Sequence, residues 1–258
     1  MEHLSKSKEA LIKSLYTRKG RKKTGLCVSE GLRCCGEVLA LKPELIRFAV
    51  CDENFDLSLL ATVPEDIPVY RVSAQKLKQF SATVATQGIL VVAEKPDTLK
   101  NSSPVEDPFI FVLDRVADPG NFGTILRTVK AVGLKELWFT SGGVDPFNDK
   151  VIRSAMGAQF GMTLREFSSL ELLADELRNN GFQRIYRTTP HSGESCFVEK
   201  DLFKKTAVII GNEANGVSEL DGSLDLTIPM PGNYESINAA QAATVILFEY
   251  VRRITGGA

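Results

Sequence analysis

Three polar loops carry the residues best suited to chemistry, and the most informative runs from Ile228 to Asn238. It reads Ile-Pro-Met-Pro-Gly-Asn-Tyr-Glu-Ser-Ile-Asn and leads into a long apolar segment. The loop brings Ser236 and Asn238 to the start of a predicted helix, and Ser236 is suited to cap it. A helix N-terminus exposes unpaired backbone N–H groups, which receive polar or anionic ligand groups. This stretch therefore predicts a ligand site.

A second loop follows residue 113 and reads Asp-Arg-Val-Ala-Asp-Pro-Gly-Asn. It ends where we expect a helix capped by Asn121. Arg127 follows within the first two turns, and its planar guanidinium could hold a phosphate or a carboxylate. A helix cap followed by a surface arginine is the simpler alternative, and the pattern alone leaves both open.

The remaining loop follows residue 210 and reads Gly-Asn-Glu-Ala-Asn-Gly. Gly211 lets a ligand approach the backbone closely. Glu213 could bond ribose hydroxyls or an amino group, although a solvated glycine-rich turn is the alternative. In the loop before Asn238, Met230 and Ile237 could flank a flat ring. None of these loops matches the dinucleotide or P-loop patterns, so an ordinary nucleotide site is weakly supported.

Short apolar segments and helical patterns alternate around the loops. We expect strands at 109–113, 136–139, 163–166, 183–187, 207–210 and 224–228, and helices at 121–132, 149–155, 170–179 and 237–253. This α/β alternation predicts a mostly parallel sheet with helices on both faces. Ligands in such sheets bind beyond the carboxyl ends of the strands, which is where all three loops lie. Small residues early in the last helix allow close packing, in the core or against a dimer partner.

A smaller α/β unit precedes this region. Its expected strands lie at 26–28, 46–50, 69–72 and 89–93, and its expected helices at 4–16, 30–41, 57–62 and 74–80. A polar, proline-containing stretch at 94–108 predicts a linker. We therefore expect an N-terminal domain at 1–95, a linker at 96–107 and a C-terminal domain at 108–258.

Composition restricts the class of protein. The 258 residues are 43% hydrophobic and 24% charged with a net charge of −1, so any affinity for nucleic acid must come from a local patch. The first 23 residues are rich in lysine and arginine, although a solvated charged face is the alternative interpretation. The candidate RNA-binding residues there are Lys13, Arg18, Lys19, Arg21, Lys22 and Lys23.

Other classes are disfavoured. No apolar run approaches the roughly 20 residues that span a bilayer, so we expect no membrane association. Five cysteines without paired spacing predict reduced thiols and a cytoplasmic protein. Two histidines make a histidine-based metal site improbable, and we expect no metal.

Taken in order, the three loops resemble the three motifs of the SpoU/TrmH family of RNA ribose 2′-O-methyltransferases, in the SPOUT superfamily. Asn121-Phe-Gly with Arg127 resembles the first motif, and Gly211-Asn-Glu with Gly216 the second. Ile228-Pro-Met-Pro-Gly followed by Glu-Ser-Ile-Asn resembles the third. The N-terminal unit is similar to the L30e-like substrate-binding domain often attached to this family. The matching segments are Val-Ser-Glu-Gly at 28–31 and Gln-Gly-Ile-Leu-Val-Val at 87–92.

The resemblance implies a deep trefoil knot in the C-terminal domain, S-adenosylmethionine as cofactor, and a homodimer formed through that domain. By position, the implied catalytic residues are Arg127, Asn121, Glu213, Ser236 and Asn238. The implied cofactor-binding residues are Thr188, Gly211, Ile228, Met230 and Ile237. Arg127 is either a phosphate clamp or the proton acceptor. The third motif departs from the family in reading Ala239-Ala240 where Val-Ser is usual.

We therefore expect an S-adenosylmethionine-dependent methyltransferase acting on a ribose 2′-hydroxyl, with ribosomal RNA favoured as substrate. Methylation of transfer RNA and a non-catalytic RNA-binding protein of the same fold are the alternatives. A dehydrogenase-like enzyme is disfavoured because the dinucleotide fingerprint is missing. The sequence names neither the RNA nor the nucleotide.

Overall fold

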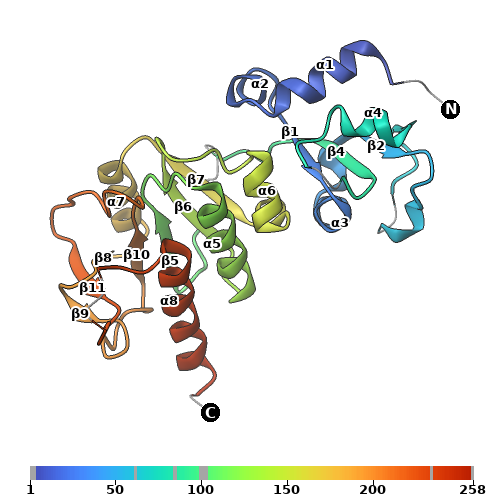
Figure 1. Ribbon diagram of the computed structural model, residues 1–258. Helices are drawn as coiled ribbons and strands as arrows, with labels where there is room; N and C mark the ends of the chain where they lie inside the picture. The colour runs from blue at the N-terminus through green and yellow to red at the C-terminus, as the bar shows by residue number, and fades with distance from the viewer. Residues whose placement is uncertain (1–3, 61–62, 84–85, 99–103, 233–234, 257–258) are drawn as a thin grey trace. The chain divides into compact units, whose positions relative to one another are not determined.

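The computed structural model describes residues 4–60, 63–83, 86–98, 104–232 and 235–256. Packing divides the chain into two units (Figure 1). Unit 1 combines Met1–Pro96 with Asp145–Gly161, and unit 2 combines Asp97–Val144 with Met162–Ala258. The domain boundaries expected from the sequence stay our proposal. The structure adds that residues 145–161 pack with the N-terminal unit.

Unit 1 is a small α/β structure around a four-stranded sheet of order β1-β4-β2-β3. The strands are β1 (Leu26–Glu30), β2 (Ile46–Asp52), β3 (Val69–Val72) and β4 (Ile89–Glu94). The helices are α1 (Lys6–Leu15), α2 (Arg18–Thr24), α3 (Leu32–Leu41), α4 (Ala74–Lys78) and α6 (Asp149–Ala155), with 3-10 turns η1 (Pro43–Leu45), η2 (Leu57–Leu59) and η3 (Ala158–Gly161). Strand β4 pairs antiparallel with β1 and β2, whereas β3 pairs parallel with β2.

Unit 2 is built on a seven-stranded sheet of order β7-β6-β5-β10-β8-β11-β9, in which every pair is parallel. The strands are β5 (Phe109–Leu113), β6 (Glu136–Thr140), β7 (Thr163–Phe167), β8 (Arg184–Thr188), β9 (Glu194–Ser195), β10 (Thr206–Ile210) and β11 (Leu224–Thr227). The helices are α5 (Pro119–Ala131), α7 (Leu170–Asn179) and α8 (Ala239–Ile254). The predicted parallel α/β fold is confirmed.

Alternate side chains of each strand face opposite layers, because successive residues of a strand point to opposite faces. Ile110 of β5 and Trp138 of β6 pack with Leu173 and Leu177 of α7 in one buried cluster. On strand β5 the neighbouring residue, Phe109, has its ring 5.0 Å from the ring of Tyr250 in α8. Helix α7 and helix α8 therefore cover opposite faces of the sheet.

Helices α5 and α8 lie side by side (Figure 1). The ring of Phe122 in α5 meets that of Phe139 in β6 edge to face at 5.6 Å. Ala243, Ile246 and Leu247 of α8 are fully buried. Both helices begin at the end of the sheet where β5, β10 and β11 end, and this placement brings the three loops together.

Two predicted helix caps are wrong. Helix α5 begins at Pro119 and is capped by Asp118, whose Oδ1 accepts a hydrogen bond from the Asn121 backbone N–H at 2.7 Å. Proline suits the first helical position because its missing N–H would have no partner there. Helix α8 is capped by Asn238 and not by Ser236. Because Asn121 and Ser236 do not cap these helices, their side chains are able to make other contacts.

Smaller differences concern short elements. Helix α2 and strand β9 were not predicted. The helix expected at 57–62 is only the 3-10 turn η2, and residues 61–62 lie outside the described residues. None of the helices in the described ranges is long and apolar enough to cross a membrane.

Candidate active site

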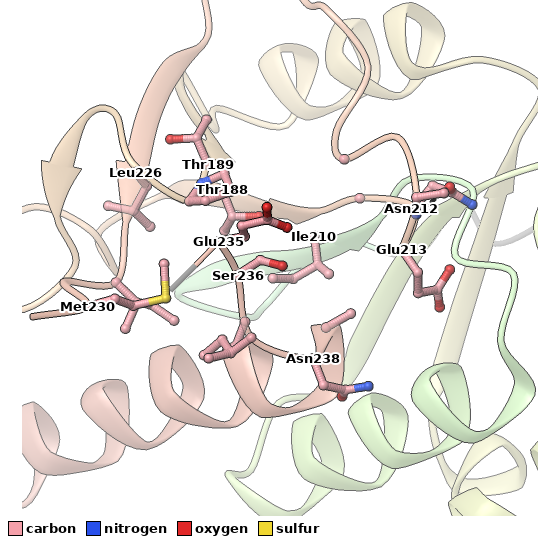
Figure 2. Close-up of a pocket in the computed structure, with 18 residues that line it drawn as sticks. Thr188, Thr189, Ile210, Asn212, Glu213, Leu226, Met230, Glu235, Ser236 and Asn238 are labelled. Atoms are coloured by element: carbon pink, nitrogen blue, oxygen red, sulfur yellow. Dashed lines mark hydrogen bonds between the residues drawn. The ribbon is translucent and has the colours of Figure 1, made fainter. Parts of the chain in front are cut away.

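A cavity of about 430 Å³ opens where β8, β10 and β11 end. All five expected cofactor-binding residues line it: Thr188, Gly211, Ile228, Met230 and Ile237. Figure 2 shows Leu226 and Met230 toward one end of the cavity and Asn212 and Glu213 toward the other. The volume falls within the roughly 300–1,000 Å³ of small-molecule sites.

Hydrogen bonds join the cavity wall near β8 to strands β11 and β10. The backbone N–H of Thr189 donates to the carbonyl of Leu226 at 2.9 Å. The hydroxyl of Thr227 donates to the carbonyl of Pro190 at 3.0 Å. The Thr188 hydroxyl donates to the carbonyl of Ile209 in β10 at 2.8 Å. These bonds hold the 188–190 segment as a fixed rim.

The loop after β10 closes on itself. Asn212 and Gly216 exchange two backbone hydrogen bonds of 3.0 and 2.8 Å. A Cβ atom on Gly211 would lie 2.1 Å from the Gly216 carbonyl carbon, so the closure requires glycine at 211. The closed loop directs the side chain of Glu213 toward α5.

A chain of hydrogen bonds joins the three loops. Asn238 Oδ1 accepts from the Ala240 backbone N–H at 2.9 Å, which turns Asn238 Nδ2 toward α5. There Nδ2 donates to Asn121 Oδ1 at 2.9 Å. Asn121 Nδ2 then donates to Glu213 Oε1 at 2.9 Å. Each amide orientation follows from the one before it, so Glu213 must act as an acceptor.

Glu213 is held as a carboxylate. The backbone N–H groups of Ala117 and Asp118 each donate to it at 3.2 Å. Partial burial opposes ionisation of Glu213, yet the bonds from Asn121 and the two backbone groups outweigh it. The pKa of Glu213 is therefore lowered below its usual range.

The other two expected catalytic residues are placed differently. Ser236 lines the cavity and is exposed. Arg127 lies on the exposed face of α5 and is not among the residues lining the cavity. The structure thus gathers Asn121, Glu213, Ser236 and Asn238, and leaves Arg127 outside the cavity of its own chain.

One candidate RNA contact must be withdrawn. Arg21 is 2% exposed, and its Nε donates to Asp145 Oδ2 at 2.7 Å while its guanidinium also reaches the Leu15 carbonyl. Because Arg21 is buried and paired, it stabilises unit 1 and is not accessible to RNA. The other five candidates, Lys13, Arg18, Lys19, Lys22 and Lys23, are exposed.

Sequence reasoning missed several residues. Thr189, Pro190 and Leu226 line the cavity without belonging to a motif. The helix start at Asp118-Pro119 was detectable, since an Asp before Pro is a strong helix-start pattern. No group of three or more histidine, cysteine or acidic side chains able to hold a metal ion occurs within the part of the chain that the structure describes.

Comparison with known sequences agrees with this geometry. A model of the SpoU rRNA Methylase family matches residues 108–248, and one of the MRM3-like substrate binding domain matches residues 10–91. The 23S rRNA (guanosine(2553)-2′-O)-methyltransferase RlmP of Bacillus subtilis is 31% identical over 92% of this chain and 92% of its own. The mitochondrial rRNA methyltransferase 3 of Mus musculus is 27% identical over 92% of this chain and 70% of its own.

Solved structures agree as well. The SpoU methyltransferase AviRb from Streptomyces viridochromogenes, in complex with the cofactor AdoMet, matches with a TM-score of 0.82 and 26% identity. That match covers 97% of this chain and 100% of the other. A TrmH-family protein from Porphyromonas gingivalis also gives 0.82, at 28% identity over 98% and 100% of the two chains. With its three loops assembled on one parallel sheet, the chain belongs to the SpoU rRNA methylase family.

Proposed function

We propose that this chain transfers the methyl group of S-adenosylmethionine to a ribose 2′-oxygen of ribosomal RNA. The observation that carries the proposal is the joining of three separate loops around one cavity through Asn238, Asn121 and Glu213. The relatives named above are rRNA methyltransferases, and the AviRb structure holds AdoMet.

The cavity suits this cofactor. Ile228, Met230 and Ile237 provide apolar walls for the flat adenine ring. Thr188 and Gly211 present backbone at the rim, where the polar edge of a base is recognised. When bound, S-adenosylmethionine supplies a methyl group already activated by its sulfonium centre.

The protein must therefore align the 2′-oxygen with that methyl group, and such alignment can contribute roughly 7–11 kcal/mol. Asn121 and Glu213 fix the loops whose spacing sets this alignment. Ser236 and Asn238 lie at the start of α8, where they are placed to meet the substrate ribose.

Arg127 has a separate task. A guanidinium group has donors only and no free lone pair, so proton acceptance suits it poorly. We assign it as a clamp on a substrate phosphate that also stabilises charge developing on the 2′-oxygen. Whether it also accepts the proton is decided by the pH profile of Arg127→Lys.

We further propose that two copies associate through the C-terminal domain, so that Arg127 serves the cavity of the partner. Two features support this assignment. Arg127 lies outside its own cavity, and two large apolar side chains of α8, Phe248 and Ile254, are 53% and 60% exposed. Sedimentation at several concentrations tests the dimer.

The remaining parts of the proposal concern RNA attachment and cell biology. Lys13, Arg18, Lys19, Lys22 and Lys23 would bind RNA phosphates in a salt-dependent manner. The trefoil knot and a cytoplasmic location are also part of the proposal. The five cysteines are all free and buried, which fits reduced surroundings.

The proposal is tested by incubating the purified protein with methyl-tritiated cofactor and either ribosomal or transfer RNA. Transfer to ribosomal RNA, recovered as a 2′-O-methyl nucleoside, is the expected result. Transfer to transfer RNA alone would replace the substrate class, and cofactor binding without transfer would favour a non-catalytic RNA-binding protein. Stabilisation by NAD but not by S-adenosylhomocysteine would favour a dehydrogenase.

A further inference from the structure

Arg115, the second residue after β5, has an unusual backbone. Its φ angle is 52°, in the left-handed region that non-glycine residues rarely adopt. The described non-glycine residues with positive φ are Gln87, Arg115, Met156 and Lys205. Such strained positions occur preferentially at functional sites, so each of them requires a physical reason.

The surroundings of Arg115 enforce this conformation. Its backbone N–H donates to Thr140 Oγ1 at 3.0 Å, and its carbonyl accepts from Asn212 Nδ2 at 3.0 Å. A Cβ atom on Gly143 would lie 3.2 Å from the carbonyl carbon of Arg115, so the 142–143 turn presses against the same backbone. A glycine at 115 would meet these constraints without strain.

Within the described part of the chain, the guanidinium of Arg115 makes one long hydrogen bond, from its Nη2 to a carboxylate oxygen. Its nearest carboxylate is Asp114, with 3.4 Å between Nη2 and Oδ2. That carboxylate is already occupied by the Thr140 hydroxyl at 2.8 Å and by the N–H and hydroxyl of Ser218 at 2.9 and 2.6 Å. The Nε of Arg115 is buried without a hydrogen-bond partner among the described residues, while the side chain is 42% exposed.

Lys205 provides a comparison within the same unit. It has the same φ of 52°, but its side chain has a structural use, because Nζ lies 4.5 Å from the centre of the Phe182 ring. Lys205 precedes β10, whereas Arg115 follows β5, so the two residues lie at opposite ends of the parallel strands. Of these two, Arg115 stands at the end where the cavity opens.

Arg115 is connected to the cavity through Asn212. Asn212, whose amide bonds the Arg115 carbonyl, lines the cavity at the end shown with Glu213 in Figure 2. Two and three residues beyond Arg115, the N–H groups of Ala117 and Asp118 donate to the Glu213 carboxylate. The Arg115 backbone is therefore fixed by residues at this end of the cavity, and its half-exposed side chain lies outside the cavity lining.

We propose that Arg115 binds a phosphate of the RNA strand at the Glu213 end of the cavity, as a second arginine subsite beside Arg127. The assignment rests on the proposed function, since it takes the ligand to be RNA. A guanidinium offers paired donors that match phosphate oxygens. The constrained backbone fixes the point from which the side chain leaves the chain, so the backbone needs no ordering on binding.

The test compares Arg115→Gly with Lys205→Gly. Each variant removes one positive charge and relieves a residue with positive φ, but Lys205 lies at the opposite end of the parallel strands. Arg115→Gly should fold with an unchanged or higher melting temperature. Its KM for RNA should rise at least about tenfold, as expected for removal of one charge-assisted hydrogen-bonded pair, with kcat and cofactor affinity unchanged. The slope of log K for RNA against log salt should fall by about 1. Lys205→Gly should leave all these RNA parameters unchanged.

Arg115→Lys adds a second measurement. It keeps the charge but not the paired donors, so the salt slope should be retained while the affinity falls. An Arg115→Gly variant with unchanged RNA slope and KM overturns the phosphate subsite. An equal effect in Lys205→Gly overturns it too, because a general charge effect then suffices. Absence of methyl transfer in the unsubstituted protein refutes the proposed function instead, and the RNA-binding slope still decides the role of Arg115.

Discussion

Replacing Asn238 with alanine or aspartate separates two roles of this side chain. Its Oδ1 caps α8 through the Ala240 and Gln241 N–H groups, and its Nδ2 holds Asn121. Alanine removes both interactions. Aspartate caps as well as asparagine but presents an oxygen to the Asn121 oxygen, so it breaks only the hydrogen bond with Asn121.

The magnitudes follow from these hydrogen bonds. Loss of the cap destabilises by about 1 kcal/mol. Asn121 is 8% exposed, so leaving its Oδ1 unpaired adds about 1–3 kcal/mol. Asn238→Ala should therefore lose about 2–4 kcal/mol of unfolding free energy. At about 2–4 °C per kcal/mol for a protein of this size, the melting temperature should fall by about 4–16 °C.

The two variants should differ in stability but should lose the same amount of catalytic activity. If the chain from Asn238 to Glu213 sets the spacing of the loops, both variants displace Glu213. Each should then lower kcat/KM by about 10²-fold, because a misplacement of about 1 Å at a reacting centre can reduce the rate by that factor. Chemical denaturation and methyl-transfer kinetics measure the two effects. An Asn238→Asp variant that is active at the unsubstituted rate would refute the role assigned to this chain of hydrogen bonds.

Four further outcomes are expected. Arg127→Ala should abolish methyl transfer while leaving cofactor affinity nearly intact, and calorimetric loss of cofactor binding would contradict the clamp. Lys22→Gln with Lys23→Gln should flatten the salt slope of RNA binding by about 0.7–0.9 for each phosphate that the variant no longer binds. Arg21→Gln should instead destabilise unit 1 by about 3 kcal/mol without changing that slope, because it breaks a buried ion pair. Because the pKa of Glu213 is lowered from 4.5, its carboxylate contributes stability above pH 4.5 that is lost as the pH falls through the folded pKa. The stability difference from Glu213→Gln should therefore shrink in acid, and a difference that grows there would contradict the assignment.

Much of unit 2 was predictable because its strands are short, apolar runs separated by helical patterns. Strand β5 and helix α7 begin and end at the predicted residues, as does α6 of unit 1. The meeting of the loops was also predictable, since all five residues expected at the cofactor site line one cavity. Periodicity and turn residues are local properties, and these elements are determined locally.

The failures have a common physical origin. Arg21 looked like part of an exposed basic arm, but its partner Asp145 lies 124 residues away and could not be recognised from local sequence. The α8 cap is Asn238 and not Ser236, and the same side chain bonds Asn121 in α5, more than 100 residues earlier in the chain. Contacts between distant segments decide such positions, and a single sequence does not contain them.

Mass spectrometry of nucleosides from ribosomal RNA treated with the purified protein and S-adenosylmethionine tests the proposed ribose methylation. A new 2′-O-methyl nucleoside is expected, carrying the methyl group of the added cofactor and missing when Arg127→Ala is used. A methyl group found on a base, or equal 2′-O-methylation by the variant, would contradict it.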